Sequence, residues 1–251
     1  MNLTQKLQSD IIEHAKLCYP EECCGVIVNG EYVPCRNDSP TPTKSFVINQ
    51  LDKDRAEDLG PIEAYVHSHP DATQHPSDYD RIKIELSEKP WVICSYPNPQ
   101  FSVNEPCGYK APLIGRNFHH GWQDCYSLIR DFYSREFEID IPDFERDDLW
   151  WEKPDGPSLY TDNFQKAGFE VVNDYKYGDV MLFSVRSNHS NHAAIYLDMQ
   201  PNLKSEQSAP CVGGPLMLHH LYGRKSNREL ISQFWQSRCT FVLRHRRFIN
   251  A

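Results

Sequence analysis

The chain has 251 residues, 39% of them hydrophobic and 24% charged, which is the composition of a globular protein with one large core or two small ones. The formal net charge of −9 disfavours nucleic acid as a partner, because phosphate backbones repel an acidic surface. No apolar run reaches the roughly 18 residues that span a bilayer, and the start lacks a secretion signal, so we expect no membrane insertion and a cytoplasmic protein. The nine cysteines form no Cys-x-x-Cys pair, which favours reduced thiols over a structural zinc site.

The first half of the chain alternates between helical and strand patterns. Leu7, Ile11 and Ala15 recur at helical spacing, and Pro20 disfavours continuation of that helix. Asn29-Gly30 is a strong hairpin turn between two apolar runs. The predicted elements are a helix over 4–19, strands over 22–28, 31–35 and 62–66, a helix over 77–87, and strands over 91–96 and 101–103.

The second half has a separate set of elements. Residues 106–121 contain two prolines and three glycines, which suits a crossing between domains, so we place a boundary near residue 107. Beyond it, the patterns predict helices over 124–133 and 159–167, and strands over 179–183, 193–197, 215–222 and 240–244. The sequence therefore predicts an α+β chain of two domains, residues 1–107 and 108–251.

The first group of candidate functional residues has the pattern of a metal site. His67 and His69 stand at i and i+2 at a strand end, so both imidazoles can point to one side and reach one ion. Ser77 and Asp80 lie one helical turn apart and can return to the same ion. Two histidines and one carboxylate leave a fourth position open for water, which is typical of catalytic zinc, and Glu22 is a candidate base.

The residue types alone leave alternatives at this site. Glu21 could serve as the base as well as Glu22, and His75 could compete as a ligand, although we expect it to be exposed. Cys23 and Cys24 are possible thiol ligands, but small buried strand residues are the commoner explanation.

The spacing of these residues resembles the JAMM family, which has an MPN-like mixed α/β fold. The matching segments are Glu22 within Pro-x-Glu-x-Cys-Gly, His67-Ser68-His69-Pro70, and Ser77-x-x-Asp80. The resemblance implies that His67, His69 and Asp80 hold Zn²⁺, that Glu22 shuttles the proton, and that Ser77 helps stabilise the oxyanion. It also implies hydrolysis of peptide or isopeptide bonds.

A second group indicates a thiol nucleophile. Asp124 is placed to cap a helix whose first turn contains Cys125, and a helix N-terminus favours the thiolate, so we expect a lowered pKa for this thiol. His192 begins a later strand and could act as the base, with a histidine of the following strand as the orienting group. His219 and His220 compete for that third role, and because adjacent strand residues face opposite ways, one of the two serves.

This second group resembles the NlpC family of papain-like cysteine endopeptidases. The family pattern is Asp-Cys at a helix start, Gly-Asp-Val before a strand, histidine at the next strand, and then a third histidine; residues 178–180 supply the middle part. The resemblance implies Cys125 as nucleophile, His192 as base and His219 as orienting residue. Tyr126 departs from the small serine that usually follows the nucleophile.

The phage branch of the NlpC family accounts for that departure. Residues 111–116, 124–131 and 219–223 look like tail tip proteins of lambda-like phages, which also join a JAMM half to an NlpC half. The resemblance implies a hydrolase that cuts peptidoglycan stem peptides, partners among the other tail tip proteins, and location in the host cytoplasm during assembly and then at the virion tail tip. The alternatives are a maturation protease for tail proteins and a structural component with inactive sites.

Overall fold

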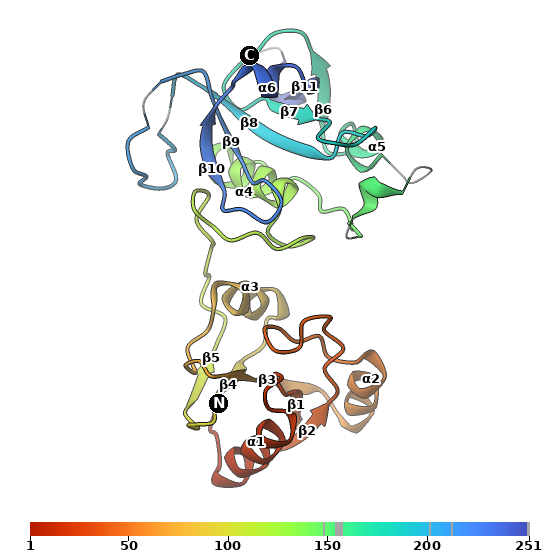
Figure 1. The fold of residues 1–251 in the computed structure, drawn as a ribbon, viewed down its shortest axis with the longest axis vertical. Helices are drawn as coiled ribbons and strands as arrows, with labels where there is room; N and C mark the ends of the chain where they lie inside the picture. Colours follow the sequence, from red (N-terminus) through yellow and green to blue (C-terminus); the bar gives the residue numbers. More distant parts are fainter. Residues whose placement is uncertain (148, 154–157, 201, 212, 250–251) are drawn as a thin grey trace. The chain divides into compact units, whose positions relative to one another are not determined.

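The computed structural model describes residues 1–147, 149–153, 158–200, 202–211 and 213–249. The chain separates into two compact units, Met1–Ala111 and Pro112–Ala251 (Figure 1). The predicted α+β class is confirmed, since each unit combines helices with one sheet. Within the described ranges, no helix is long and apolar enough to cross a membrane.

The first unit is a five-stranded sheet with three helices. The strand order is β2-β1-β3-β4-β5, in which β3 and β4 pair in parallel and the other neighbours are antiparallel. The elements are α1 (Gln5–Cys18), β1 (Cys24–Val28), β2 (Glu31–Cys35), α2 (Gln50–Leu59), β3 (Ile62–Pro70), α3 (Asp78–Ser87), β4 (Trp91–Tyr96) and β5 (Phe101–Asn104).

Two apolar clusters hold helices α1 and α2 against the sheet of this unit. Leu7 and Ile11 of α1 pack with strand residues that include Val66 and Val92, as expected from their helical spacing. Helix α2 contributes Ala56 to a separate cluster with residues of β1 and β3. The sequence did not predict α2, because Ala56 is its one buried residue and a charged helix with so narrow an apolar contact has no visible stripe.

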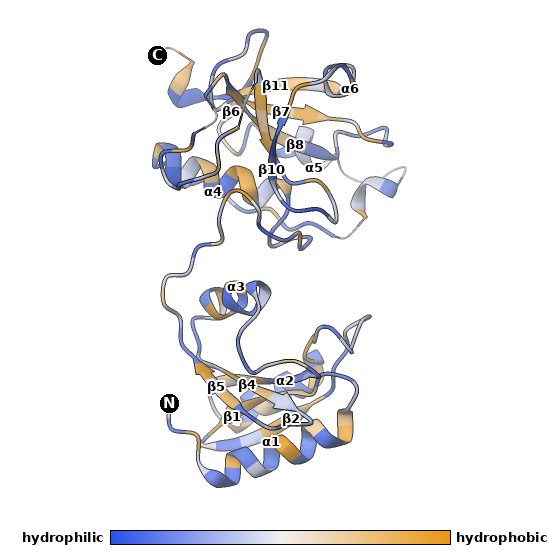
Figure 2. Ribbon diagram, turned by 60° about the vertical axis from the view of Figure 1, so that its left-hand side comes forward, coloured by the Kyte–Doolittle hydropathy of each residue, from blue (hydrophilic) through white to orange (hydrophobic). Residues whose placement is uncertain are grey.

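The second unit is a six-stranded antiparallel sheet in the order β10-β9-β8-β7-β11-β6. Its elements are α4 (Cys125–Phe137), η1 (Trp150–Glu152), α5 (Leu159–Asn163), β6 (Phe169–Val172), β7 (Val180–Phe183), β8 (His192–Asp198), β9 (Leu216–His219), β10 (Asn227–Leu230), α6 (Gln233–Gln236), β11 (Cys239–His245) and η2 (Arg246–Phe248). Helix α4 packs on β8 through a large apolar core (Figure 2).

The structure adds elements here that the sequence did not predict. Strands β6 and β10 and helix α6 are short and carry few buried residues, so they leave little periodicity to detect. The strand predicted over 215–222 ends at His219, and α4 continues four residues beyond the predicted end to Phe137.

Candidate functional sites

The first unit brings His67, His69 and Asp80 together. The period-two alternation of β3 points both imidazoles to one side, and the start of α3 presents Asp80 to them. The two Nε2 atoms are 3.0 Å apart, and Asp80 places Oδ1 3.3 Å from His67 Nε2 and Oδ2 3.3 Å from His69 Nε2. Among the described residues these three form the group able to hold a metal ion.

The donor set fits zinc in chemistry and in spacing. Ligand atoms about 2.0–2.2 Å from zinc at the corners of a tetrahedron lie about 3.4 Å apart, close to the separations found. His69 Nδ1 lies 2.7 Å from the carbonyl oxygen of Thr73 and must donate to it, which leaves the lone pair on Nε2. Burial alone would raise the pKa of Asp80, but the adjacent His67 and His69 and the hydroxyl of Ser77 hold it well below its ordinary value.

Glu22 is the buried acid beside this group. Its side chain is shielded, whereas Glu21 is exposed, so burial separates two residues that the sequence could not. Burial raises the pKa of Glu22 to about 7, with His69 opposing and Asp80 adding to the shift. A carboxyl with such a pKa can take up and return a proton near neutral pH. His75 is exposed and lies outside the ligand group.

Ser77 lies next to the ligands as the N-cap of α3. Its hydroxyl donates to Asp80 Oδ2 at 2.7 Å, and its backbone amide donates to the same oxygen at 2.8 Å. The side chain of Ser77 therefore orients Asp80, a candidate ligand, in this structure. Cys23 and Cys24 are buried outside the ligand group, and burial raises the pKa of the Cys23 thiol to about 11, as expected of structural thiols.

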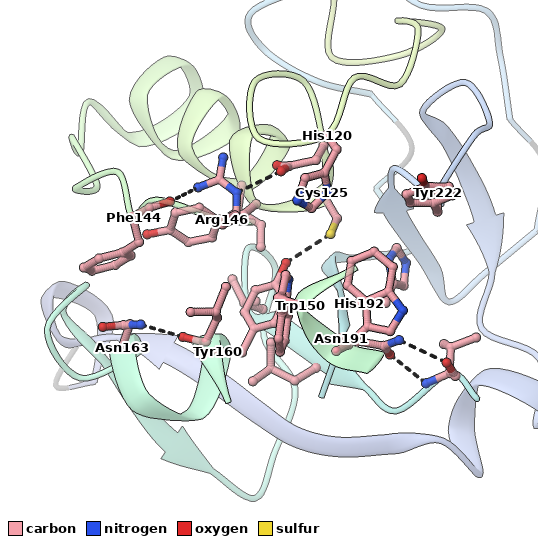
Figure 3. A pocket seen from close by; sticks show the side chains of 18 of the residues that line it. His120, Cys125, Phe144, Arg146, Trp150, Tyr160, Asn163, Asn191, His192 and Tyr222 are labelled. Carbon is pink, nitrogen blue, oxygen red and sulfur yellow. Dashed lines mark hydrogen bonds and ion pairs between the residues drawn. The ribbon is translucent and has the colours of Figure 1, made fainter. Parts of the chain in front are cut away.

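In the second unit, Cys125 is the first residue of α4. Asp124 caps the helix by accepting from the backbone N–H of Ser127 at 2.9 Å, and an ion pair with Arg146 at 2.8 Å holds the carboxylate in place. The Sγ atom of Cys125 lies 3.0 Å from the hydroxyl of Tyr160 (Figure 3). The amides of the first helical turn point towards this end of the helix, where they could stabilise a developing oxyanion.

The lowered pKa expected for Cys125 is wrong. Burial and the neighbouring Asp124 carboxylate raise the pKa of the thiol to about 11, despite the Tyr160 hydroxyl, which acts in the opposite direction. A helix N-terminus is worth about 0.3–1 kcal/mol to a negative charge. A rise from 9.0 to about 11 corresponds to about 3 kcal/mol, so burial outweighs the helix.

The histidines form a hydrogen-bonded relay. His192 Nε2 lies 3.1 Å from His219 Nδ1, and His219 Nε2 lies 3.0 Å from Glu229 Oε2. His220 turns away and packs edge-on against Phe118. The structure thus brings His219, rather than His220, to His192, while burial and the charge of Arg116 lower the pKa of His220 to about 4.

A cavity of about 410 Å³ is lined by both Cys125 and His192 (Figure 3). Apolar and aromatic side chains form most of its wall, and its buried charges, Asp124 and Arg146, pair with each other. The wall residues with an aromatic ring are Phe118, Tyr126, Phe144, Trp150, Trp151, Tyr160, Phe164, Phe169 and Tyr222, with His120 and His192 among the polar ones.

Three residues of this site were missed from the sequence. Tyr160 and Arg146 come from the long connection between α4 and β6, and Glu229 comes from a polar edge strand. None of them has a local pattern that marks it. Tyr160 contacts Cys125 across 35 residues and Arg146 pairs with Asp124 across 22, whereas Glu229 reaches His219 only because their two strands pair. Conservation across relatives is the signal that could have revealed them.

The fold and both sites define the class of protein. A family model of prokaryotic homologues of the JAB domain matches residues 4–104, and the NlpC/P60 family model matches residues 115–244. The chain is therefore a JAB domain followed by an NlpC/P60 domain, and both are peptidase families. This confirms the fusion that the sequence motifs predicted.

Two relatives narrow the class further. Tail tip assembly protein K of Escherichia phage N15 is 34% identical over 249 residues, covering 97% of this chain and 96% of the relative. Tail tip assembly protein K of Escherichia phage lambda is 37% identical over 195 residues, covering 76% of this chain and 86% of the relative. The chain belongs to the tail tip assembly protein K family.

A solved structure of a JAB1/MPN domain protein from Archaeoglobus fulgidus also resembles this chain. It is 19% identical, covers 45% of this chain and 94% of its own, and superposes with a TM-score of 0.30. That score is too low to support an argument about the site.

Proposed function

We propose that this chain is a tail tip hydrolase whose two domains each cut peptide bonds. In the second domain, Cys125 is the nucleophile, His192 the general base and His219 the residue that orients it, acting on peptidoglycan stem peptides. The observation that supports this most is the 3.1 Å contact of His219 Nδ1 with Nε2 of His192, a residue that lines the same cavity as the thiol. The substrate class follows the NlpC resemblance.

The residues of this site can carry out acyl transfer. The thiol of Cys125 is protonated at rest, so His192 takes its proton as Sγ attacks the scissile carbonyl. The new S–C bond forms as the C–N bond breaks, and the proton passes from His192 to the leaving amine. Water then cleaves the thioester with the same histidine as base, which regenerates the thiol.

In the first domain, we propose that His67, His69 and Asp80 hold Zn²⁺ for peptide or isopeptide hydrolysis. A bound zinc ion would supply an activated water and polarise the scissile carbonyl. Glu22, with its pKa near 7, would take and return the proton. Ser77 is the proposed oxyanion group, a role that requires its hydroxyl to turn away from Asp80.

We also propose where the protein acts. The other tail tip proteins are its partners, with assembly in the host cytoplasm and a final position at the virion tail tip, in line with the two phage relatives. A net charge of −9 gives no electrostatic attraction to an anionic cell wall. Delivery by the tail would therefore place the enzyme at its substrate.

A second candidate is a maturation protease that trims tail proteins. The apolar and aromatic wall of the cavity beside Cys125 favours it, because a carboxylate-bearing stem peptide would lose hydration against such a wall. A large apolar side chain of a protein substrate would gain from burial there.

One incubation distinguishes these functions. Wild type and Cys125→Ser are each mixed with peptidoglycan sacculi or with tail tip proteins, with and without a zinc chelator, and products are identified by mass spectrometry. We expect release of muropeptides that Cys125→Ser abolishes and the chelator leaves intact. Cleavage of tail proteins alone would favour the maturation protease, and no product from either substrate would favour a structural role. In the active case, His219→Ala should reduce the rate more than His220→Ala.

A further inference from the structure

The histidine relay ends on a carboxylate that the sequence motifs do not include. Glu229 lies on β10, the strand that pairs with β9 and its His219. Glu229 Oε2 is 3.0 Å from His219 Nε2, and Glu229 Oε1 is 2.9 Å from the indole Nε1 of Trp235 on α6. Each carboxylate oxygen therefore meets a different nitrogen. Trp235 also packs its ring against both His192 and His219.

These contacts determine which nitrogens carry protons. A carboxylate can only accept, so His219 must carry its proton on Nε2 and present a lone pair at Nδ1. That lone pair accepts from His192 Nε2, which must then be protonated. A neutral imidazole has one N–H, so His192 keeps its lone pair on Nδ1, the ring nitrogen that the relay does not use and that can therefore accept a proton.

These tautomers exist only if both imidazoles are neutral, and the surroundings of the two rings favour the neutral form. Burial is the largest cause that lowers the pKa of His192, with the two neighbouring histidines adding to the effect. Burial also lowers the pKa of His219, where Glu229 and Asn227 oppose the shift and Arg224 reinforces it. Both rings are thus neutral near pH 7.

We infer that Glu229 is a positioning residue of the cysteine site, which selects the tautomer of His219 and through it the tautomer in which His192 can accept a proton from Cys125. The inference rests on the proposed function of the second domain. An amide at this half-exposed position on an edge strand would make the same number of hydrogen bonds. Selection of the tautomer explains why the residue is a carboxylate instead.

Glu229→Gln is the informative substitution because it can keep every hydrogen bond and still exchange the donor and acceptor in each hydrogen bond of the relay. The indole N–H of Trp235 can only donate, so it would hold the amide oxygen of the glutamine. The glutamine NH2 would then face His219 Nε2 and force that nitrogen to accept. The proton of His219 would move to Nδ1, and His192 Nε2 would become the acceptor. His192 Nδ1 would then carry the proton and could no longer accept one from Cys125.

Trp235→Phe provides the matching rescue. In the double variant Glu229→Gln/Trp235→Phe, no indole competes for the amide oxygen, so the glutamine can rotate and accept from His219 Nε2. The productive tautomers are then accessible again. Glu170→Gln is the matched control, because it also converts a strand carboxylate to an amide, in an exposed ion pair with Arg246.

The experiment reads tautomers and activity separately, on the full chain. Long-range ¹H–¹⁵N spectra of histidine-labelled protein report which ring nitrogen is protonated, whether or not a substrate is cleaved. We expect Glu229→Gln to exchange the tautomers of His192 and His219 and to lower kcat on the order of 100-fold with KM unchanged. The melting temperature should stay within about 3 °C of wild type, because Glu229 is half-exposed.

The double variant should recover the wild-type tautomers, and its kcat should be at least about tenfold higher than that of Glu229→Gln. Glu170→Gln should match wild type in tautomers, kcat and melting temperature. Unchanged tautomers in Glu229→Gln, or a double variant no better than Glu229→Gln, would overturn the role of Glu229. A wild-type protein that shows the inferred tautomers but cleaves neither sacculi nor tail proteins would instead refute the proposed function and leave the relay standing.

Discussion

The Cys125 thiol should be protonated at neutral pH, with His192 as its base when substrate is bound. Its pKa of about 11, set mainly by burial, compares with about 8.5 for a free cysteine. At pH 7.5 the thiolate fraction is therefore about two to three orders of magnitude smaller than that of a free cysteine. We expect alkylation of Cys125 by iodoacetamide to be slower than that of free cysteine by a similar factor.

The assay measures the alkylation rate of Cys125 by mass spectrometry between pH 6 and 10, with N-acetylcysteine amide as the reference thiol. The rate should still be rising at pH 10, because the thiol titrates above that value. Tyr160→Phe should move the rise to still higher pH, since its hydroxyl lowers the pKa of the thiol; Tyr126→Phe, whose hydroxyl donates instead to the Pro142 carbonyl, is the control. A rate that reaches a plateau below pH 8.5 would refute burial as the dominant effect.

Three further predictions concern the first domain and the boundary. Protein made in zinc-sufficient medium should carry about one zinc per chain by plasma mass spectrometry, and His67→Ala/His69→Ala should carry none; equal zinc in both would rule out the site. Glu22→Gln should keep the zinc and lose the hydrolysis of this domain, because it removes a base and no ligand, and loss of the metal would reassign Glu22 as a ligand. Fragments 1–107 and 108–251 should each unfold cooperatively in calorimetry, whereas two insoluble fragments would indicate a shared core.

Local patterns predicted much of the fold and of both sites. The period-two strand that carries His67 and His69 and the capped helix that begins at Cys125 are features of a few consecutive residues, so the sequence alone reveals them. The order of these motifs also sufficed for the resemblance to the two peptidase families, which the family models confirm.

Long-range contacts account for what the sequence did not predict. The pKa of Cys125 depends on burial and on Tyr160, 35 residues away, and neither can be seen in the first turn of a helix. Glu229 lies on a polar edge strand without an alternating pattern, so its contact with His219 emerges only when β10 pairs with β9. Helix α2 escaped detection for a similar reason, since one buried alanine makes no stripe.

The most direct test of a cysteine-dependent peptidase is digestion of peptidoglycan sacculi by wild type and by Cys125→Ser, with soluble muropeptides measured by chromatography and mass spectrometry. The two proteins must first be matched in melting temperature and zinc content, which should agree because the proposed zinc ligands lie in the other domain. We predict that wild type releases muropeptides cut within the stem peptide and that Cys125→Ser releases none. Equal release by both proteins would contradict the assignment of Cys125 as the nucleophile.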